Sequence, residues 1–213
     1  MKTLLLSALL ICPGFFGFVG GQTQQTAKDR FHTHDGFFLR LLGGIGSGNV
    51  VVTDIPLLFP FMGFEDKVLT LSGKTFTYRI QIGTAVAKNL ILFGEIGASS
   101  LDDPDVDGIN ASIRDYGAGL CYYFMPLNFY FSGSITISHA AIEVKEVWYS
   151  ATPRPGAGFF ISAGKEWWAA ADLGLGIAGF MYVSHMTDID KYYDQVLPVK
   201  NTVFGLVFSA TYQ

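Results

Sequence analysis

Five charged residues of the apolar, alternating segments of the sequence share one face of their segments, and they are the first candidates for chemistry. Each falls on the positions that also carry Gly and Ser, opposite a face of aliphatic and aromatic residues. Side chains alternate between the two faces of a strand, so this pattern predicts that all five point into a common interior. Unpaired charges in a nearly dry interior are costly, so we expect a cross-strand ion-pair network. Its members are Arg40, Arg79, Glu95, Asp115 and Glu166.

Two serine–histidine neighbours are the candidates for catalysis. Ser138-His139 and Ser184-His185 each stand at the end of an alternating segment, and Glu143 is close to the first pair. A nucleophile needs its base within hydrogen-bond reach, but adjacent residues of a strand point to opposite faces. A pairing across strands has no support in the sequence. We therefore predict no catalytic residues and no enzyme activity, and a lipid-modifying enzyme is kept as an alternative.

Two further patterns could bind a metal ion. His32 and His34 have the spacing of a ligand pair, and the segment 102–107 carries four aspartates. Calcium takes carboxylate oxygens, but this segment lacks the Gly and Glu positions of an EF-hand loop. We expect solvated residues at both places, with no metal and no cofactor. Calcium binding by the acidic segment stays open.

Alternation with period two recurs along the chain and predicts eight strands. Their ranges are 36–46, 75–86, 90–98, 112–124, 129–138, 156–166, 173–183 and 202–212. Ile113 is out of phase with its strand, which predicts a bulge or a later start. The connections 87–89, 125–128 and 167–172 are short, and those between them are long. Short turns on one side and long loops on the other are typical of an outer-membrane barrel with an even strand number.

The two faces of these strands decide what surrounds the barrel. The charged residues share a face with Gly and Ser, and an Arg or Lys facing lipid near the midplane would cost about 2–4 kcal/mol. The charged face therefore lines the interior and the aliphatic face meets lipid, the reverse of a soluble lipocalin-type barrel. The predicted fold class is all-β, an eight-stranded antiparallel up-and-down transmembrane β-barrel over residues 35–213.

The composition agrees with this fold. Half of the 213 residues are hydrophobic, and the mean hydropathy is +0.35, yet no long apolar run follows the N-terminus. The net charge of −4 gives no basic footprint for nucleic acid. Residues 1–21 are typical of a secretory signal peptide, and 22–34 form a polar periplasmic segment. Once the signal is removed Cys121 is the only cysteine, which excludes an internal disulfide.

Aromatic and apolar residues outside the strand interiors mark the two ends of the predicted barrel. A periplasmic-side aromatic girdle is expected at the short turns, formed by Tyr122, Phe124, Phe129, Trp167, Trp168 and Tyr212. The first long connection carries an apolar stretch, expected to be external, with Ile55, Leu57, Leu58, Phe59, Phe61, Met62 and Phe64. An exposed apolar patch often marks an interaction site. The stretch either forms a lid or hydrophobic-ligand site, or packs between strands that extend above the membrane.

Three segments carry a family resemblance. TVFGLVFSATY (202–212) resembles the C-terminal signal strand of bacterial outer-membrane barrels, although Gln213 follows the aromatic residue. HDGFFLRLLGGIG (34–46) and GKEWW (164–168) resemble segments of uncharacterised outer-membrane β-barrel domain proteins. The mature chain as a whole is similar to small eight-stranded barrels of the OmpA, OmpX and OmpW type. The resemblance implies the outer membrane of a Gram-negative-type bacterium, contact with membrane lipid and lipopolysaccharide, assembly by the outer-membrane machinery, and a monomer.

The function expected from these features is a non-enzymatic outer-membrane barrel with a structural or surface-interaction role. The alternative is a narrow, porin-like channel or a hydrophobic-ligand conduit of the OmpW type. The ion-pair network would fill the barrel and hold its register in the first case, and would gate a narrow pore in the second. An eight-stranded barrel is only just wide enough for side chains to fill, which favours the first.

Overall fold

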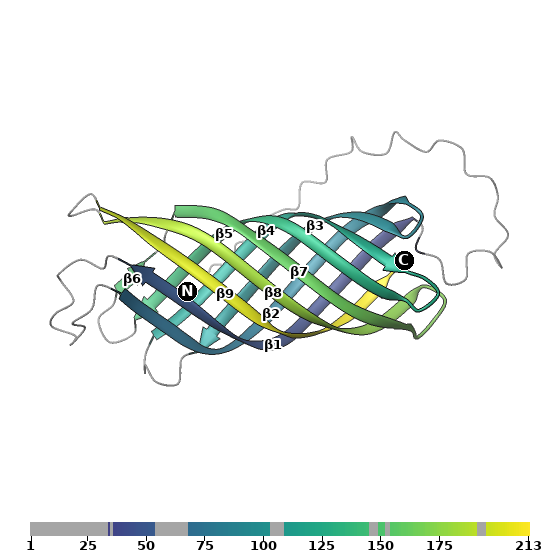
Figure 1. Cartoon of the computed structure of the whole chain (residues 1–213), viewed down its shortest axis with the longest axis horizontal. Coiled ribbons are helices and arrows are strands. Elements are labelled where there is room, and N and C mark those ends of the chain that lie inside the picture. Colours follow the sequence, from purple (N-terminus) through teal and green to yellow (C-terminus); the bar gives the residue numbers. More distant parts are fainter. Residues whose placement is uncertain are drawn as a thin grey trace, which may run out of the picture. The chain divides into compact units, whose positions relative to one another are not determined.

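A closed antiparallel barrel is the architecture of the chain in this computed structural model. The structure describes residues 34, 36–53, 68–102, 109–144, 149–151, 154–190 and 195–213, all within one compact unit of residues 32–213. Its strands are β1 (Phe37–Thr53), β2 (Val68–Ala87), β3 (Leu90–Asp102), β4 (Ile109–Phe124), β5 (Phe129–Val144), β6 (Tyr149–Ala151), β7 (Arg154–Trp168), β8 (Leu173–Asp190) and β9 (Gln195–Tyr212). Figure 1 shows the short connections β2–β3, β4–β5 and β7–β8 at the end of the barrel where the C-terminus lies.

Eight of these strands form the barrel wall, as the sequence predicted. Each pairs antiparallel with its neighbours, and the pairing of β1 with β9 closes the ring. The short β6 is added to the far end of β5 and lies outside this count. Among the described residues, no helix is long and apolar enough to cross a membrane.

The strands are staggered, so a residue and its direct partner on the next strand lie at slightly different heights along the barrel axis. A line of paired residues that starts at Leu41 returns to β1 at Val51, ten residues further along the strand. Shared over eight strands, this is a rise of about one and a quarter residues per strand, with a strand tilt of about 35–45°. The interior of such a barrel is narrow enough for side chains to fill it.

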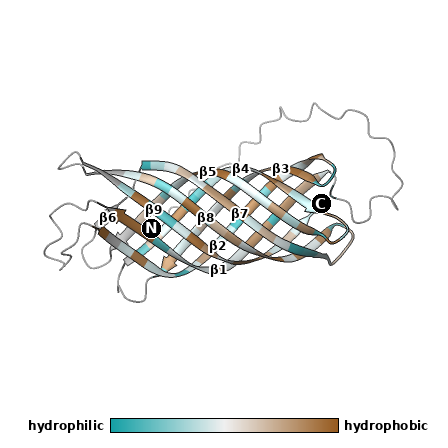
Figure 2. Cartoon of the chain, in the orientation of Figure 1, coloured by the Kyte–Doolittle hydropathy of each residue, from teal (hydrophilic) through white to brown (hydrophobic). Residues whose placement is uncertain are grey.

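The outer surface of the barrel is apolar. Ile135 is 71% exposed and Phe208 is 65% exposed, whereas Arg40 and Arg79 are at most 1% exposed. This distribution is the reverse of that in a soluble protein, and Figure 2 shows hydrophobic and hydrophilic residues interspersed along the strands. The apolar band runs from Phe37 to Ile45 on β1. With a tilted strand rising about 3.3 Å per residue, the band is on the order of 20–25 Å tall, which suits a bilayer.

The strands are longer than the alternation predicted. The connections 47–74 and 184–201 were expected as loops, but β1 continues to Thr53 and the β8–β9 ladder continues to the pair Asp190↔Gln195. Beyond the apolar band neither face of a strand meets lipid, so the hydrophobic pattern fades while the backbone pairing continues. Ile113 was also misjudged: it is buried in the interior, and the ladders of β4 run past it without a bulge.

Candidate functional site

The five charged residues form one network inside the barrel. Arg40 Nε lies 3.2 Å from Glu166 Oε1. Arg79 Nη1 lies 3.0 Å from Glu95 Oε1 and 2.7 Å from Asp115 Oδ1, and its Nη2 donates to Asp115 Oδ2 at 3.0 Å. Two parallel contacts to one carboxylate fix the guanidinium plane as well as its charge. All five side chains are buried.

Gln81 links the two ion-paired groups. Its Oε1 accepts from Arg40 Nη1 at 3.4 Å, and its Nε2 donates to Glu95 Oε2 at 3.0 Å. The links follow from strand register, because Gln81 is the direct partner of Arg40 on β1 and of Glu95 on β3. The network therefore spans β1, β2, β3, β4 and β7, and shifting any of these strands by one residue would move a member out of the interior.

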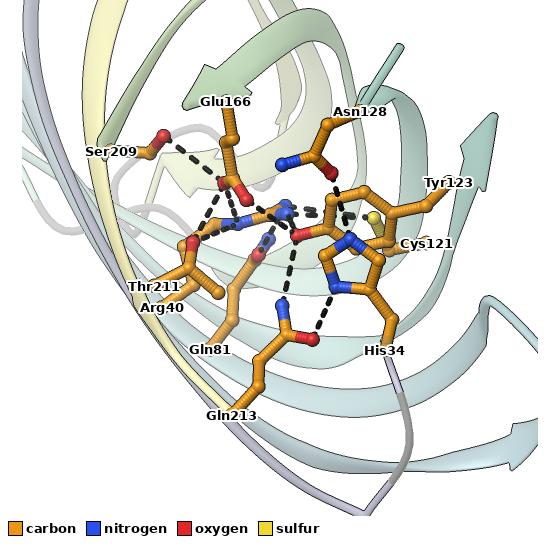
Figure 3. Close-up of polar contacts among 10 residues, drawn as sticks. All are labelled: His34, Arg40, Gln81, Cys121, Tyr123, Asn128, Glu166, Ser209, Thr211 and Gln213. Atoms are coloured by element: carbon orange, nitrogen blue, oxygen red, sulfur yellow. Dashed lines mark hydrogen bonds and ion pairs between the residues drawn. The ribbon is translucent and has the colours of Figure 1, made fainter. Parts of the chain in front are cut away.

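Two of the three carboxylates, Glu166 and Glu95, accept hydrogen bonds from hydroxyl groups as well. Glu166 accepts from Tyr123 Oη at 2.9 Å, Ser209 Oγ at 3.2 Å and Thr211 Oγ1 at 2.7 Å. Glu95 also accepts from Ser134 Oγ. Buried carboxylates are tolerated when their lone pairs are satisfied in this way. Figure 3 shows these donors, one from β4 and two from β9, converging on Glu166.

Aromatic rings enclose both guanidinium groups. The Arg40 guanidinium carbon lies 4.1 Å from the ring centre of Tyr130 and 5.0 Å from that of Phe38. That of Arg79 lies 3.9 Å from the ring centre of Phe160. Desolvated cation–π contacts of this kind are favourable and fill space. Arg40 also donates to Tyr123 Oη and contacts the buried free thiol of Cys121 at 3.6 Å.

His34 closes the end of this network, and sequence reasoning missed it. It was expected to be solvated, but it is 1% exposed. Its Nε2 lies 2.7 Å from Asn128 Oδ1, its Nδ1 contacts Gln213 Oε1, and its ring stacks on Tyr123 at 3.4 Å between ring centres. Figure 3 shows the imidazole held between these two amides. Burial lowers the pKa of His34 below 6.5, against the opposing effect of its hydrogen bonds.

Trp168 corrects the predicted girdle. Its ring stacks on the buried His34 ring at 5.2 Å, so it lies on the interior side of β7 rather than in an outward girdle. Trp167, its neighbour, points outward, because adjacent residues of a strand face opposite sides. The other girdle residues are exposed near the short-turn end: Tyr122, Phe124, Phe129, Trp167 and Tyr212.

An apolar layer fills the interior beyond the ion-pair network. Its buried side chains meet across strands as direct partners, such as Val50 with Leu71 and Met186 with Val199. We call it the outer apolar layer: Val50, Val52, Leu71, Leu101, Ala111, Ile113, Ala140, Met186, Val199 and Val203. The buried polar atoms of Thr75, Ser184 and Asn201 have no hydrogen-bond partner among the described residues. The loss of alternation above the membrane concealed this layer in the sequence.

Comparison with known proteins identifies the architecture. No family model and no curated protein matches the sequence. The solved structure of Neisserial surface protein A matches with a TM-score of 0.50 and 12% identity over 83% of this chain and 96% of that one. The outer membrane protein AlkL matches with a TM-score of 0.50 and 10% identity over 90% and 94%. The fold is that of the small outer-membrane β-barrels.

The likeness to these solved structures, at 10–12% identity, shows the fold alone. The outer membrane protease OmpT of Escherichia coli also matches, with a TM-score of 0.41 and 8% identity over 84% of this chain and 97% of that one, and this likeness supports no argument about chemistry. The fold and the apolar exterior together place the chain in an outer membrane, in contact with lipid. The specific role has to come from the residues of this chain.

In each serine–histidine pair, the two side chains lie on opposite faces of the barrel wall. Ser138 is buried and its hydroxyl lies 2.6 Å from Tyr182 Oη, whereas His139 faces outward and its Nε2 lies 3.1 Å from Tyr116 Oη. Ser184 is buried and His185 is exposed. Neither histidine can act on the serine beside it.

Several predicted features lie outside the described residues. They are the apolar stretch 55–64, aspartates 103, 105 and 107 of the acidic segment, and residue 32. Within the described part of the chain, no three His, Cys, Asp or Glu side chains are grouped to hold a metal ion.

Proposed function

We propose that the protein is a non-enzymatic outer-membrane barrel with a structural or surface-interaction role, and that its interior does not conduct. The observation that carries this proposal is the filling of the interior. From the short-turn end outward come the stacked His34 and Tyr123, then the ion-paired network, then the outer apolar layer. Charges that are paired and enclosed by rings hold the strands in register and are poorly suited to passing ions.

The projecting strands support the surface role. Beyond the apolar band, β8 and β9 stay paired from Val183↔Thr202 to Asp190↔Gln195, and β1 stays paired with β2 to Thr53↔Val68. A paired ladder is stiffer than a loop, so it raises the external connections above the lipid on a rigid base. Such a base suits contacts with partners outside the membrane.

Conductance in planar bilayers tests the sealed interior. The refolded wild-type barrel is expected to give no steady channel current, whereas an open porin inserted under the same conditions does. Arg79→Ala is the informative variant, because it removes the cation at the centre of the network. Steady single-channel currents from the wild type, altered in Arg79→Ala, would overturn the proposal in favour of a gated pore.

A hydrophobic-ligand conduit of the OmpW type is the second candidate. The apolar lining of the external interior favours it, because Leu71, Leu101 and Met186 would contact an apolar molecule entering there. Binding of a fluorescent fatty acid to the refolded barrel tests it. Saturable binding of the fatty acid that Leu71→Asp abolishes would support a conduit. A wild-type barrel that binds no fatty acid would support the sealed interior.

Maturation and assembly follow from the same proposal. We infer that residues 1–21 are removed, that the following residues to His34 lead from the periplasm into the barrel, and that β9 serves as the strand recognised during assembly. β9 also closes the ring on β1, with Tyr212 opposite Leu39. The mass of the purified mature chain tests the cleavage, and light scattering in detergent tests the expected monomer.

A further inference from the structure

Basic side chains follow directly above the apolar band on the outer surface. On β4, the outward series changes from Leu120 and Tyr116 to Arg114, and on β9 it changes from Phe204 to Lys200. The same change occurs on β2, β5, β7 and β8. All these side chains are exposed except that of His139, which is half-buried. We call this set the outer basic belt: Lys74, Arg114, His139, Arg154, His185 and Lys200.

The register of the barrel places the belt at one height. Arg114 is the direct partner of His139, and His185 is the direct partner of Lys200. After correction for the stagger of the strands, the heights of the six side chains along the barrel differ by no more than about four residue positions. Residues that are far apart in the sequence therefore form a ring at the outer edge of the lipid-facing surface.

The belt is positively charged and has little internal compensation. Within the described ranges, all the ion pairs are those of the interior network, and none includes a belt residue. At this height Asp102 is exposed, and it is the strand partner of Lys74. The remaining members form two clusters on adjacent strands: Arg114 with His139, and Arg154 with His185 and Lys200.

Position and charge together indicate the ligand. Where the apolar exterior ends, the hydrocarbon ends too, and side chains that point outward there meet lipid headgroups. Guanidinium groups bind phosphate through two parallel hydrogen bonds, and lysine binds it as a point charge. Tyr116 orients His139, since its hydroxyl lies 3.1 Å from Nε2 and its ring stacks on the imidazole.

We propose that the outer basic belt binds the phosphate groups of lipid headgroups in the outer leaflet. The two clusters bind them on adjacent stretches of the barrel wall, one at β4 and β5 and the other at β7, β8 and β9, because β5 pairs directly with β7. The contacts fix the depth of the barrel in the membrane and order a shell of phosphorylated lipid around the base of the projecting strands. This inference depends on the membrane position of the barrel and not on whether its interior conducts.

Enrichment of phosphatidic acid around the barrel tests phosphate binding by the belt directly. The mature barrel is refolded in phosphatidylcholine vesicles that contain a minor fraction of phosphatidic acid, extracted in mild detergent, and its retained lipid is counted by mass spectrometry. The wild type is expected to retain phosphatidic acid well above its share of the vesicle. The variant R154Q/H185Q/K200Q should lose at least half of that enrichment, and Lys88→Gln, an exposed lysine in a periplasmic turn, should lose none.

Three outcomes would overturn the proposal. One is equal enrichment in the belt variant and the wild type. Another is an equal loss in Lys88→Gln, which would show a response to net charge alone. The third is loss of enrichment on adding millimolar inorganic phosphate at constant ionic strength, which would make the belt a site for free phosphate. A heat-dependent gel shift confirms that each variant is folded, and Lys200→Gln replaces the triple variant if the latter is not.

Discussion

The two halves of the barrel interior are filled in different ways by the same eight strands. The half nearer the short turns holds Arg40, Arg79 and their carboxylates, each with directed hydrogen bonds. The external half holds cross-strand apolar pairs such as Val50 with Leu71. Directed contacts specify one register and are sensitive to charge, whereas apolar contacts specify volume and tolerate repacking. The contrast predicts that mutations in the two halves will destabilise the barrel in different ways.

Charge reversal at Arg79 should have the largest effect. Arg79→Glu places a third carboxylate beside Glu95 and Asp115, and breaking a buried ion pair costs about 3–5 kcal/mol even without added repulsion. The urea midpoint for unfolding of the refolded barrel should fall sharply. Lys88→Glu is the control, because it changes the net charge by the same amount but lies in an exposed turn. A midpoint equal to that of the wild type would mean that the network does not stabilise the barrel.

Truncation in the outer apolar layer should have the next largest effect, without the dependence on charge. Leu71→Ala removes a fully buried side chain and should cost about 2–5 kcal/mol, while Leu71→Met keeps the volume and should cost less than about 1.5 kcal/mol. Both are measured by urea unfolding. Equal costs for the two variants would show that this half is not packed.

Gly97 tests how closely the polar half is packed. A Cβ there would lie 2.8 Å from Arg79 Nη1 and 2.9 Å from Asp115 Oδ1, so Gly97→Ala should displace the ion pair and cost about 1–3 kcal/mol. Gly94 is on the same strand and faces lipid, and the nearest atom to its Cβ position is 3.8 Å away. Gly94→Ala should be nearly neutral. Equal destabilisation by both would indicate a general effect of glycine replacement in β3.

The smallest expected effect is the pH dependence from His34. Burial lowers its pKa in the folded state below 6.5, so the unfolded chain binds a proton more readily. The neutral imidazole therefore contributes its full stability above about pH 6.5, and that contribution is lost as the pH falls towards the folded-state pKa. The urea midpoint of the wild type should drop more between pH 7.5 and pH 5 than that of His34→Gln. Equal drops would contradict the buried neutral imidazole.

The sequence predicted most of the strands that form the barrel wall, but fewer of the side-chain contacts that fill the interior. Alternation identified the strands within the membrane, because lipid on one side imposes period two, and it put Arg79 and Glu95 on the interior face. It could not show that Gln81 joins them to Arg40, since the stagger of the strands decides which residues meet. His34 was missed because it precedes the alternating segment and is buried by tertiary contacts, which join it to Tyr123 and Trp168 as well as to the amides of Asn128 and Gln213.

Strand length and Trp168 were misjudged for related reasons. Above the bilayer, β8 and β9 stay paired along their backbones, and backbone pairing by itself imposes no hydrophobic period on the sequence. Trp168 was assigned to the girdle because tryptophan is common at membrane interfaces, but its partner is the ring of His34. The outer apolar layer likewise resembles an irregular loop in sequence, and only the register shows that its members meet.

The thiol of Cys121 gives the most direct test of a sealed interior. It is buried beside Arg40, in the middle of the polar half. In the mature barrel refolded in vesicles, a small charged thiol reagent should modify Cys121 at least a hundredfold more slowly than in the chain unfolded in urea. Rapid modification of the folded barrel, at a rate close to that of the unfolded chain, would mean that water and ions reach the network, and the interior would have to be considered a pore.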